Sequence, residues 1–193
     1  NMTQEEYRQA AIDAVKQLSA DVGIPADLTN EGIRGLKHEK STFFPAQIGQ
    51  GCTWDKELIY EIGRITGEEA KALGYTNVYS PILDLSRDPR WGRTVESYGE
   101  DSYLAGELGR QQVLGIQSNR VVSTPKHFAI YGIPGGGRDC YSRTDPHASP
   151  QEVHELHLEP FRIAFQEAGA LGTMCSHNDY NGTPVSASHY LMT

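Results

Sequence analysis

The chain contains 193 residues, of which 38% are hydrophobic and 22% are charged, and its formal net charge is −8. This composition is typical of a globular protein with a sizeable core and excludes a disordered chain. The acidic balance, and the lack of any apolar run near the roughly 18 residues that span a bilayer, argue against nucleic acid and membrane partners and favour a neutral ligand.

The first predicted element is an amphipathic helix over residues 4–19, whose many charged and amide side chains distinguish it from a signal peptide. The apolar segment 22–28 predicts a strand, although it contains Pro25, and a polar loop with glycines continues to Gln50. The apolar residues of the helix at 4–19 share one face, so this helix is predicted to pack on a core. They are Tyr7, Ala11, Ala14, Val15 and Leu18.

Two helices and a strand are predicted in the next part of the chain. Thr53 is a candidate N-cap for the first helix, and Gly74 is placed to end it. Residues 77–79 read as a strand, and a long polar loop leads from it to a helix over residues 101–116.

A further buried strand is predicted over residues 120–128, where it ends in the pair Lys126 and His127. A glycine-rich, charged insertion follows at 132–147. We therefore expect a long loop at this position, between two regular elements.

The C-terminal part begins with a strong helix signal, because Ser149 is followed by Pro150 at the first helical position and by Glu152 two residues later. Pro160 should kink or split that helix. The last apolar strand, 170–176, leads into His177.

The order of elements is a helix followed by repeated strand–loop–helix units, which predicts an α/β fold with parallel strands. Four such units in this length predict a partial (β/α)8 TIM-type barrel that stops before closure, because a complete barrel needs about 250 residues. Residues 1–193 then form the N-terminal portion of a single barrel domain. A complete flavodoxin-like sheet is the alternative.

The run SPILDLSRDPRWGRTVESYGED, residues 80–101, concentrates charge where a buried strand is predicted to end. In α/β proteins, loops at the carboxyl ends of strands bind small molecules. The alternative is an ion-pair network that only pins a long loop.

Right-handed winding of the units would bring the polar residues at the strand ends to one rim. One carboxylate, two cations and two imidazoles suit a ligand that carries many hydroxyl groups, and sugars are the obvious class. A lysine extending from a strand end beside a core histidine is the alternative for the pair at the third strand. The candidate binding residues are Glu31, Arg93, Lys126, His127 and His177.

Cofactor and metal motifs are weak. The chain has no phosphate-loop motif, and its three cysteines lack CxxC spacing. His154 and His157 are three residues apart, whereas the helical zinc motif places its histidines four apart. The sequence therefore predicts no cofactor and no metal, and a metal-dependent hydrolase is kept as a third hypothesis.

These motifs together resemble the N-terminal barrel domain of glycoside hydrolase family 3, the β-glucosidase and β-xylosidase family. The likeness covers nearly the whole chain, with several motifs in order. The family-like segments are 30–35 (NEGIRG), 44–54, 80–84 (SPILD), 88–93 (DPRWGR), 96–101 (ESYGED) and 126–128 (KHF).

The resemblance implies that Glu31, Arg93, Lys126 and His127 hold the nonreducing-end sugar in subsite −1, the sugar site on that side of the scissile bond. The first of these is commonly Asp in the family. Where many members have Tyr in Met-x-Ser-Tyr, this chain has His177, so an imidazole replaces a tyrosine that faces the transition state in the family.

The resemblance also implies a retaining, exo-acting β-glucosidase that acts on a β-linked oligosaccharide or glucoside, with a periplasmic or extracellular location. Such enzymes need two carboxylates about 5 to 5.5 Å apart. In this family the nucleophile lies on a later strand and the acid/base in a following α/β domain, so both are expected beyond Thr193 and neither in this chain. The carboxylates of the 80–101 run are then expected to hold the loop that presents Arg93: Asp84, Asp88, Glu96 and Asp101. A β-xylosidase and a non-catalytic carbohydrate-binding module are the alternatives.

Overall fold

The computed structural model describes residues 2–133 and 144–193, so most of the predicted glycine-rich insertion lies outside the described residues. Two 3-10 turns, at Thr94–Glu96 and Val185–Ala187, and two π-helical segments, at Val153–His157 and Ile163–Glu167, accompany the regular elements. The helices and strands are α1 (Gln4–Val22), β1 (Thr29–Glu31), α2 (Gln47–Gly51), α3 (Lys56–Ala72), β2 (Asn77–Tyr79), α4 (Ser102–Gln117), β3 (Val122–Ser123), β4 (Lys126–Phe128), α5 (Pro150–Glu152), α6 (Glu159–Arg162), β5 (Met174–Cys175), β6 (Asp179–Tyr180), β7 (Thr183–Pro184) and α7 (His189–Met192).

The strands follow one another in space in the order of the sequence. β1, β2 and β3 form a parallel sheet in that order, and β4 pairs in parallel with β5. A parallel bridge between Ile82 and Lys126 joins the two parts. A flavodoxin-like sheet would place the second strand at the edge and the first strand inside. The observed order is that of an open barrel wall, so the predicted partial (β/α)8 barrel is confirmed.

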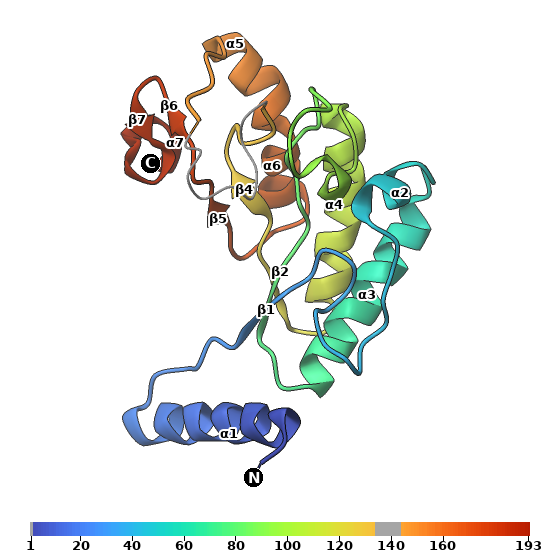
Figure 1. The fold of residues 1–193 in the computed structure, drawn as a ribbon, viewed down its shortest axis with the longest axis vertical. Helices are drawn as coiled ribbons and strands as arrows, with labels where there is room; N and C mark the ends of the chain where they lie inside the picture. Colours follow the sequence, from blue (N-terminus) through green and yellow to red (C-terminus); the bar gives the residue numbers. More distant parts are fainter. Residues whose placement is uncertain (1, 134–143) are drawn as a thin grey trace.

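Helices α3 and α4 pack side by side along the sheet (Figure 1). Glycines allow this close approach, because a Cβ at Gly63 would lie 2.6 Å from the carbonyl oxygen of Gln112, and one at Gly115 would lie 2.3 Å from that of Tyr60. Gly67 also faces a carbonyl of α4. The backbones therefore touch directly along this seam, which fixes the spacing of the strands that the helices connect.

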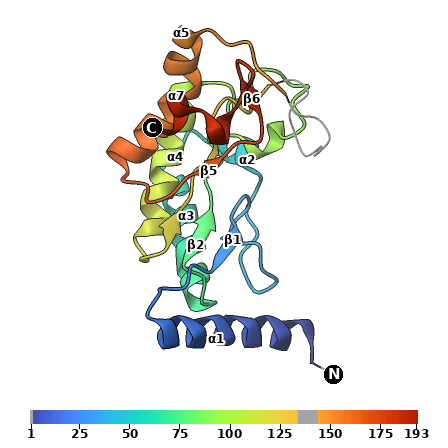
Figure 2. The ribbon, with the colours of Figure 1, turned by 90° about the vertical axis from the view of Figure 1, so that its left-hand side faces the viewer.

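Helix α1 forms where a helix was expected, but the expected packing of its apolar face is wrong. The helix lies across the end of the sheet at which β1 begins (Figure 2), and of its residues, all of which the structure describes, Ile12 alone is buried. Tyr7 and Leu18 are 72% and 61% exposed. Amphipathic spacing specifies that one face is apolar without specifying what covers it.

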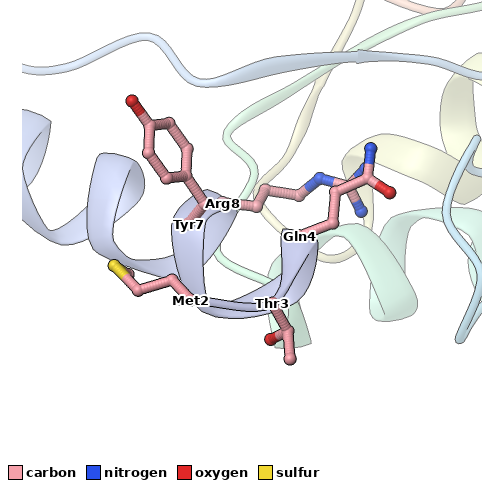
Figure 3. Close-up of a pocket in the computed structure, with 5 residues that line it drawn as sticks. All are labelled: Met2, Thr3, Gln4, Tyr7 and Arg8. Carbon is pink, nitrogen blue, oxygen red and sulfur yellow. The ribbon is translucent and has the colours of Figure 1, made fainter.

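A pocket lies beside the first turn of α1 (Figure 3). Helix α1 forms one end of the molecule, and the parallel strands lie between it and the end that carries α5, β6 and β7 (Figure 1). The lining of the pocket contains none of the predicted site residues and consists of Met2, Thr3, Gln4, Tyr7 and Arg8.

Three predicted strand boundaries are corrected. Helix α1 continues to Val22 and ends at Gly23, whose φ is +71°, so the strand expected at 22–28 is replaced by β1 at Thr29–Glu31. The strand expected at 120–128 is divided into β3 and β4 around Pro125, which has no backbone N–H to donate. The strand expected at 170–176 shortens to β5.

Helix boundaries follow the capping signals closely. Asp55, and not Thr53, is the N-cap of α3, and its carboxylate accepts a hydrogen bond from the backbone N–H of Leu58 at 3.0 Å. Ser149 caps α5 as predicted. The helix that starts there is interrupted by π-helical segments on both sides of Pro160, so the predicted split is confirmed.

The antiparallel hairpin of β6 and β7 was not predicted, although the sequence carried its signal. Asn181 and Gly182 connect the strands with φ of +51° and +77°. Positive φ at both central residues is the geometry of the two-residue hairpin turn for which Asn-Gly is strongly favoured. No helix in the described part of the chain has the length and apolar character needed to cross a membrane.

Candidate functional site

Four of the five predicted binding residues meet near the carboxyl ends of the parallel strands. Glu31 ends β1, and Lys126 and His127 belong to β4. Arg93 lies on the long loop after the second strand and immediately precedes a 3-10 turn. We call Glu31, Arg93, Lys126 and His127, with their partners Asp84 and Glu96, the strand-end cluster.

Lys126 is a buried cation with 1% of its surface exposed. Its Nζ donates a hydrogen bond to Oε2 of Glu31, and it lies 5.8 Å from the centre of the Tyr79 ring. Burial lowers the pKa of Lys126, and the hydrogen bond and attraction to Glu31 offset this only in part. The ammonium group is therefore held in a place from which water is largely excluded.

Arg93 is fixed by a bidentate ion pair with Glu96. Its Nε donates to Oε1 at 3.0 Å, and its Nη2 donates to Oε2 at 2.6 Å. Burial alone would lower the pKa of Arg93, but the hydrogen bonds and attraction to Glu96 raise it above its ordinary value. Both side chains are mostly buried, so the pair holds the guanidinium in one orientation.

His127 lies between Arg93 and Asp84. Its Nε2 is 3.0 Å from Nη1 of Arg93, and its Nδ1 is 2.7 Å from Oδ2 of Asp84. The same carboxylate oxygen accepts a hydrogen bond from the backbone N–H of His127 at 3.1 Å. The ring of Tyr131 packs against the imidazole edge-on at 5.2 Å, so the imidazole is held on several sides.

His177 does not join these contacts. It is exposed, and among the described residues no hydrogen bond or ion pair to it is found. Its position in the chain still places it beyond the end of β5, because the preceding residue, Ser176, donates its backbone N–H to Phe128 O at 2.7 Å. The structure therefore brings the other four residues together and leaves His177 at the surface.

Three of the remaining charges of the 80–101 run have separate tasks. Asp88 and Arg90 pair with each other at the surface, and Asp101 caps α4 by accepting the backbone N–H of Leu104 at 2.7 Å. The expectation that these carboxylates organise the loop agrees with these contacts.

Two members of the site were missed or misjudged. Asp84 was expected to pin the loop, whereas all the hydrogen bonds found for it in the described residues go to His127. Tyr131, which also lies 5.8 Å from the Arg93 guanidinium, lies three residues beyond the end of β4 and carried no motif. An Asp directly after the apolar pair Ile82 and Leu83 was the available signal for the first.

The chemistry of the cluster is that of recognition. Two cations and three carboxylates in a partly buried site can donate to and accept from the hydroxyl groups of a neutral ligand. Within residues 2–133 and 144–193, no group of three or more His, Cys, Asp or Glu side chains is placed to hold a metal ion. In this part of the chain each of the three carboxylates is engaged by a cation or by the imidazole.

The profile of the glycosyl hydrolase family 3 N-terminal domain matches residues 1–193. The chain belongs to glycosyl hydrolase family 3. It is 36% identical over 190 residues to a β-xylosidase of Formosa agariphila, in an alignment that covers 89% of this chain and 25% of that protein. It is 32% identical over 197 residues to a periplasmic β-glucosidase of Salmonella typhimurium, in an alignment that covers 99% of this chain and 24% of that protein.

A solved structure of a β-glucosidase from Erythrobacter marinus has the same fold. It superposes with a TM-score of 0.88 at 29% identity and covers all of this chain and 26% of that one. The chain thus spans about a quarter of the length of the family 3 proteins that it matches.

Proposed function

We propose that this chain supplies the subsite −1 residues of a retaining, exo-acting β-glucosidase, which removes terminal β-D-glucosyl residues from a glucoside or β-linked oligosaccharide. The observation that carries the proposal is the strand-end cluster, which holds buried cations at the rim where barrel enzymes bind ligands. In the proposal, Glu31, Arg93, Lys126 and His127 grip the sugar, and His177 lies at the edge of the site.

The proposal assigns residues 1–193 to the N-terminal portion of a single (β/α)8 barrel domain. The open sheet and the coverage of about a quarter of the related proteins support this assignment. The nucleophile and the acid/base are then supplied by the rest of the barrel and by a following domain. We further propose a periplasmic or extracellular location, which the name of the Salmonella typhimurium relative supports.

A β-xylosidase is the second candidate, because one of the most similar relatives carries that name. The two candidates share the reaction and differ in the sugar. Aryl β-D-glucoside and aryl β-D-xyloside hydrolysis by the full-length protein distinguishes them. Faster hydrolysis of the xyloside would replace the first candidate by the second, and sugar binding without any hydrolysis would favour a binding module.

The site assignment is tested by Lys126→Ala and Arg93→Ala in the full-length protein. Each should weaken glucose binding by roughly 1.5 to 3 kcal/mol, because each removes a charged hydrogen bond to the sugar. Calorimetry measures the affinity, and circular dichroism checks the fold. Arg90→Ala, on the same loop but at the surface, is the matched control and should bind as the wild type does. Unchanged affinity in a folded Lys126→Ala variant contradicts the assignment.

Residues 1–193 expressed alone should give no measurable turnover of an aryl β-glucoside, since both catalytic carboxylates are assigned to other parts of the protein. Robust turnover by this segment would contradict the proposed division of the active site.

A further inference from the structure

We propose that His127 is a neutral imidazole protonated on Nδ1, and that Asp84 acts through this ring as a positioning residue for Arg93. The proposal about the ring stands on the contacts alone. Its consequence for sugar binding rests on the proposed function.

The proton of the ring is located by the chemistry of its two neighbours. A guanidinium group carries only donors, so an atom within hydrogen-bond distance of Arg93 Nη1 must accept. His127 Nε2, at 3.0 Å, is therefore a lone pair and not an N–H. A neutral imidazole with a free Nε2 carries its proton on Nδ1, and that nitrogen lies 2.7 Å from Asp84 Oδ2. Both contacts are then hydrogen bonds.

The other protonation states fail at one or both contacts. An imidazolium would direct Nε2–H at the guanidinium and place two cations side by side. The opposite neutral tautomer would face the Asp84 carboxylate with a lone pair and Arg93 with a proton, so it loses both bonds. Because the His127 and Asp84 side chains are 4% and 1% exposed, water does not readily replace a lost partner.

Within residues 2–133 and 144–193, the hydrogen bonds of Asp84 go to His127 alone. Its Oδ2 accepts both from Nδ1 and from the backbone N–H of His127, and its buried Oδ1 has no hydrogen-bond partner in the described part of the chain. A carboxylate used to pin a loop would bond to that loop. This one is committed to the orientation and tautomer of His127.

The ring in turn completes the fixation of Arg93. Glu96 holds Nε and Nη2 of the guanidinium, and His127 accepts from Nη1, so all three nitrogens have a defined partner. Among the described residues, Lys126 precedes the ring in the chain and Tyr131 packs against it edge-on. In this arrangement Nε2 of His127 accepts from Arg93, so the ring fixes the guanidinium that is proposed to contact the sugar.

The tautomer is measured by ¹⁵N NMR of histidine-labelled full-length protein at neutral pH, with His127→Gln used to assign the signals. We expect a protonated Nδ1 and an unprotonated Nε2. A protonated Nε2, alone or together with Nδ1, overturns the proposal. This result does not depend on sugar binding, so it stands even if the wild type binds neither glucose nor xylose and the proposed function fails.

The positioning role is measured by glucose affinity in Asp84→Ala and Asp84→Asn. Loss of the bond to the ring in Asp84→Ala should weaken binding roughly tenfold. Asp84→Asn should rescue part of this, because its amide oxygen can still accept from Nδ1–H. Asp88→Asn removes a surface carboxylate from the same loop and is the control, with unchanged affinity. If Asp84→Ala does not fold, Asp84→Asn together with the NMR measurement decides.

Two results would overturn the positioning role. One is a folded Asp84→Ala variant with wild-type affinity in a protein that binds glucose. The other is an Asp84→Asn variant that binds no better than Asp84→Ala, because the hydrogen bond to the ring would then have no effect on the grip.

Discussion

Two arginine–carboxylate pairs lie on the loop between β2 and α4, and they have nearly the same geometry. Arg90 donates its Nε and Nη2 to Asp88 at 2.9 and 2.6 Å, and Arg93 donates the same atoms to Glu96 at 3.0 and 2.6 Å. Their surroundings differ. The side chains of the first pair are 77% and 25% exposed, whereas those of the second are 13% and 3% exposed.

This difference shows that burial, and not the ion pair itself, separates a side-chain pair held in one geometry from a surface contact. Arg90 lowers the pKa of Asp88 to about 2 by hydrogen bonding, yet that pair remains open to solvent and to screening by salt. The pair of Arg93 and Glu96 cannot exchange its partners for water without cost, so it keeps one geometry.

The largest expected effect compares removal of the two carboxylates. Glu96→Ala leaves the Arg93 charge buried without this carboxylate and should lower the free energy of unfolding by about 3 kcal/mol. Asp88→Ala should leave it unchanged within error, since Arg90 is already solvated. Urea unfolding of the full-length protein measures both. Equal losses in the two variants would show that the pairs do not differ as their exposure indicates.

A second, smaller effect compares the two arginines at constant charge. Arg93→Lys should weaken glucose binding roughly tenfold, because an ammonium group cannot make the bidentate contact and also reach His127. Arg90→Lys should bind glucose as the wild type does. Isothermal calorimetry at one salt concentration gives both affinities. Wild-type glucose affinity in the Arg93→Lys variant would show that a positive charge at this position is sufficient and that the bidentate geometry of the guanidinium has no effect.

The smallest effect extends the comparison to two histidines one turn apart. His157 is buried, and burial lowers its pKa, whereas His154 is exposed. As pH falls below the ordinary value of about 6.5, the unfolded chain gains a proton that folded His157 resists, so stability decreases with acidification. His157→Gln should reduce this loss and His154→Gln should not. Thermal unfolding at pH 7.5 and at lower pH measures it, and identical slopes in both variants would refute the role of His157.

The sequence allowed much of the fold to be predicted because its signals are local. The strand at 77–79 and the helix start at Ser149 depend on neighbouring residues, and the structure has both. Glu31, Arg93, Lys126 and His127 could be predicted to converge because parallel units wound in one sense place their strand ends on one rim.

The features that could not be predicted depend on contacts between distant parts of the chain. The bond between Asp84 and His127 joins residues 43 positions apart, and no local pattern shows that these two side chains are partners. The exposure of α1 is a second case, since its apolar spacing says nothing about a partner. The Asn181-Gly182 turn differs, because its dipeptide is a local signal that could have been used.

The contact between α3 and α4 has a consequence for how this chain tolerates mutation. At Gly63, Gly67 and Gly115 the neighbouring atom is a backbone carbonyl, which cannot rotate away as a side chain can. Every substitution there adds at least a Cβ, so charge, polarity and size of the new residue matter little. In a saturation mutagenesis library these positions should reject all replacements alike, whereas Arg90 and Asp88, in the open loop, should accept most of them.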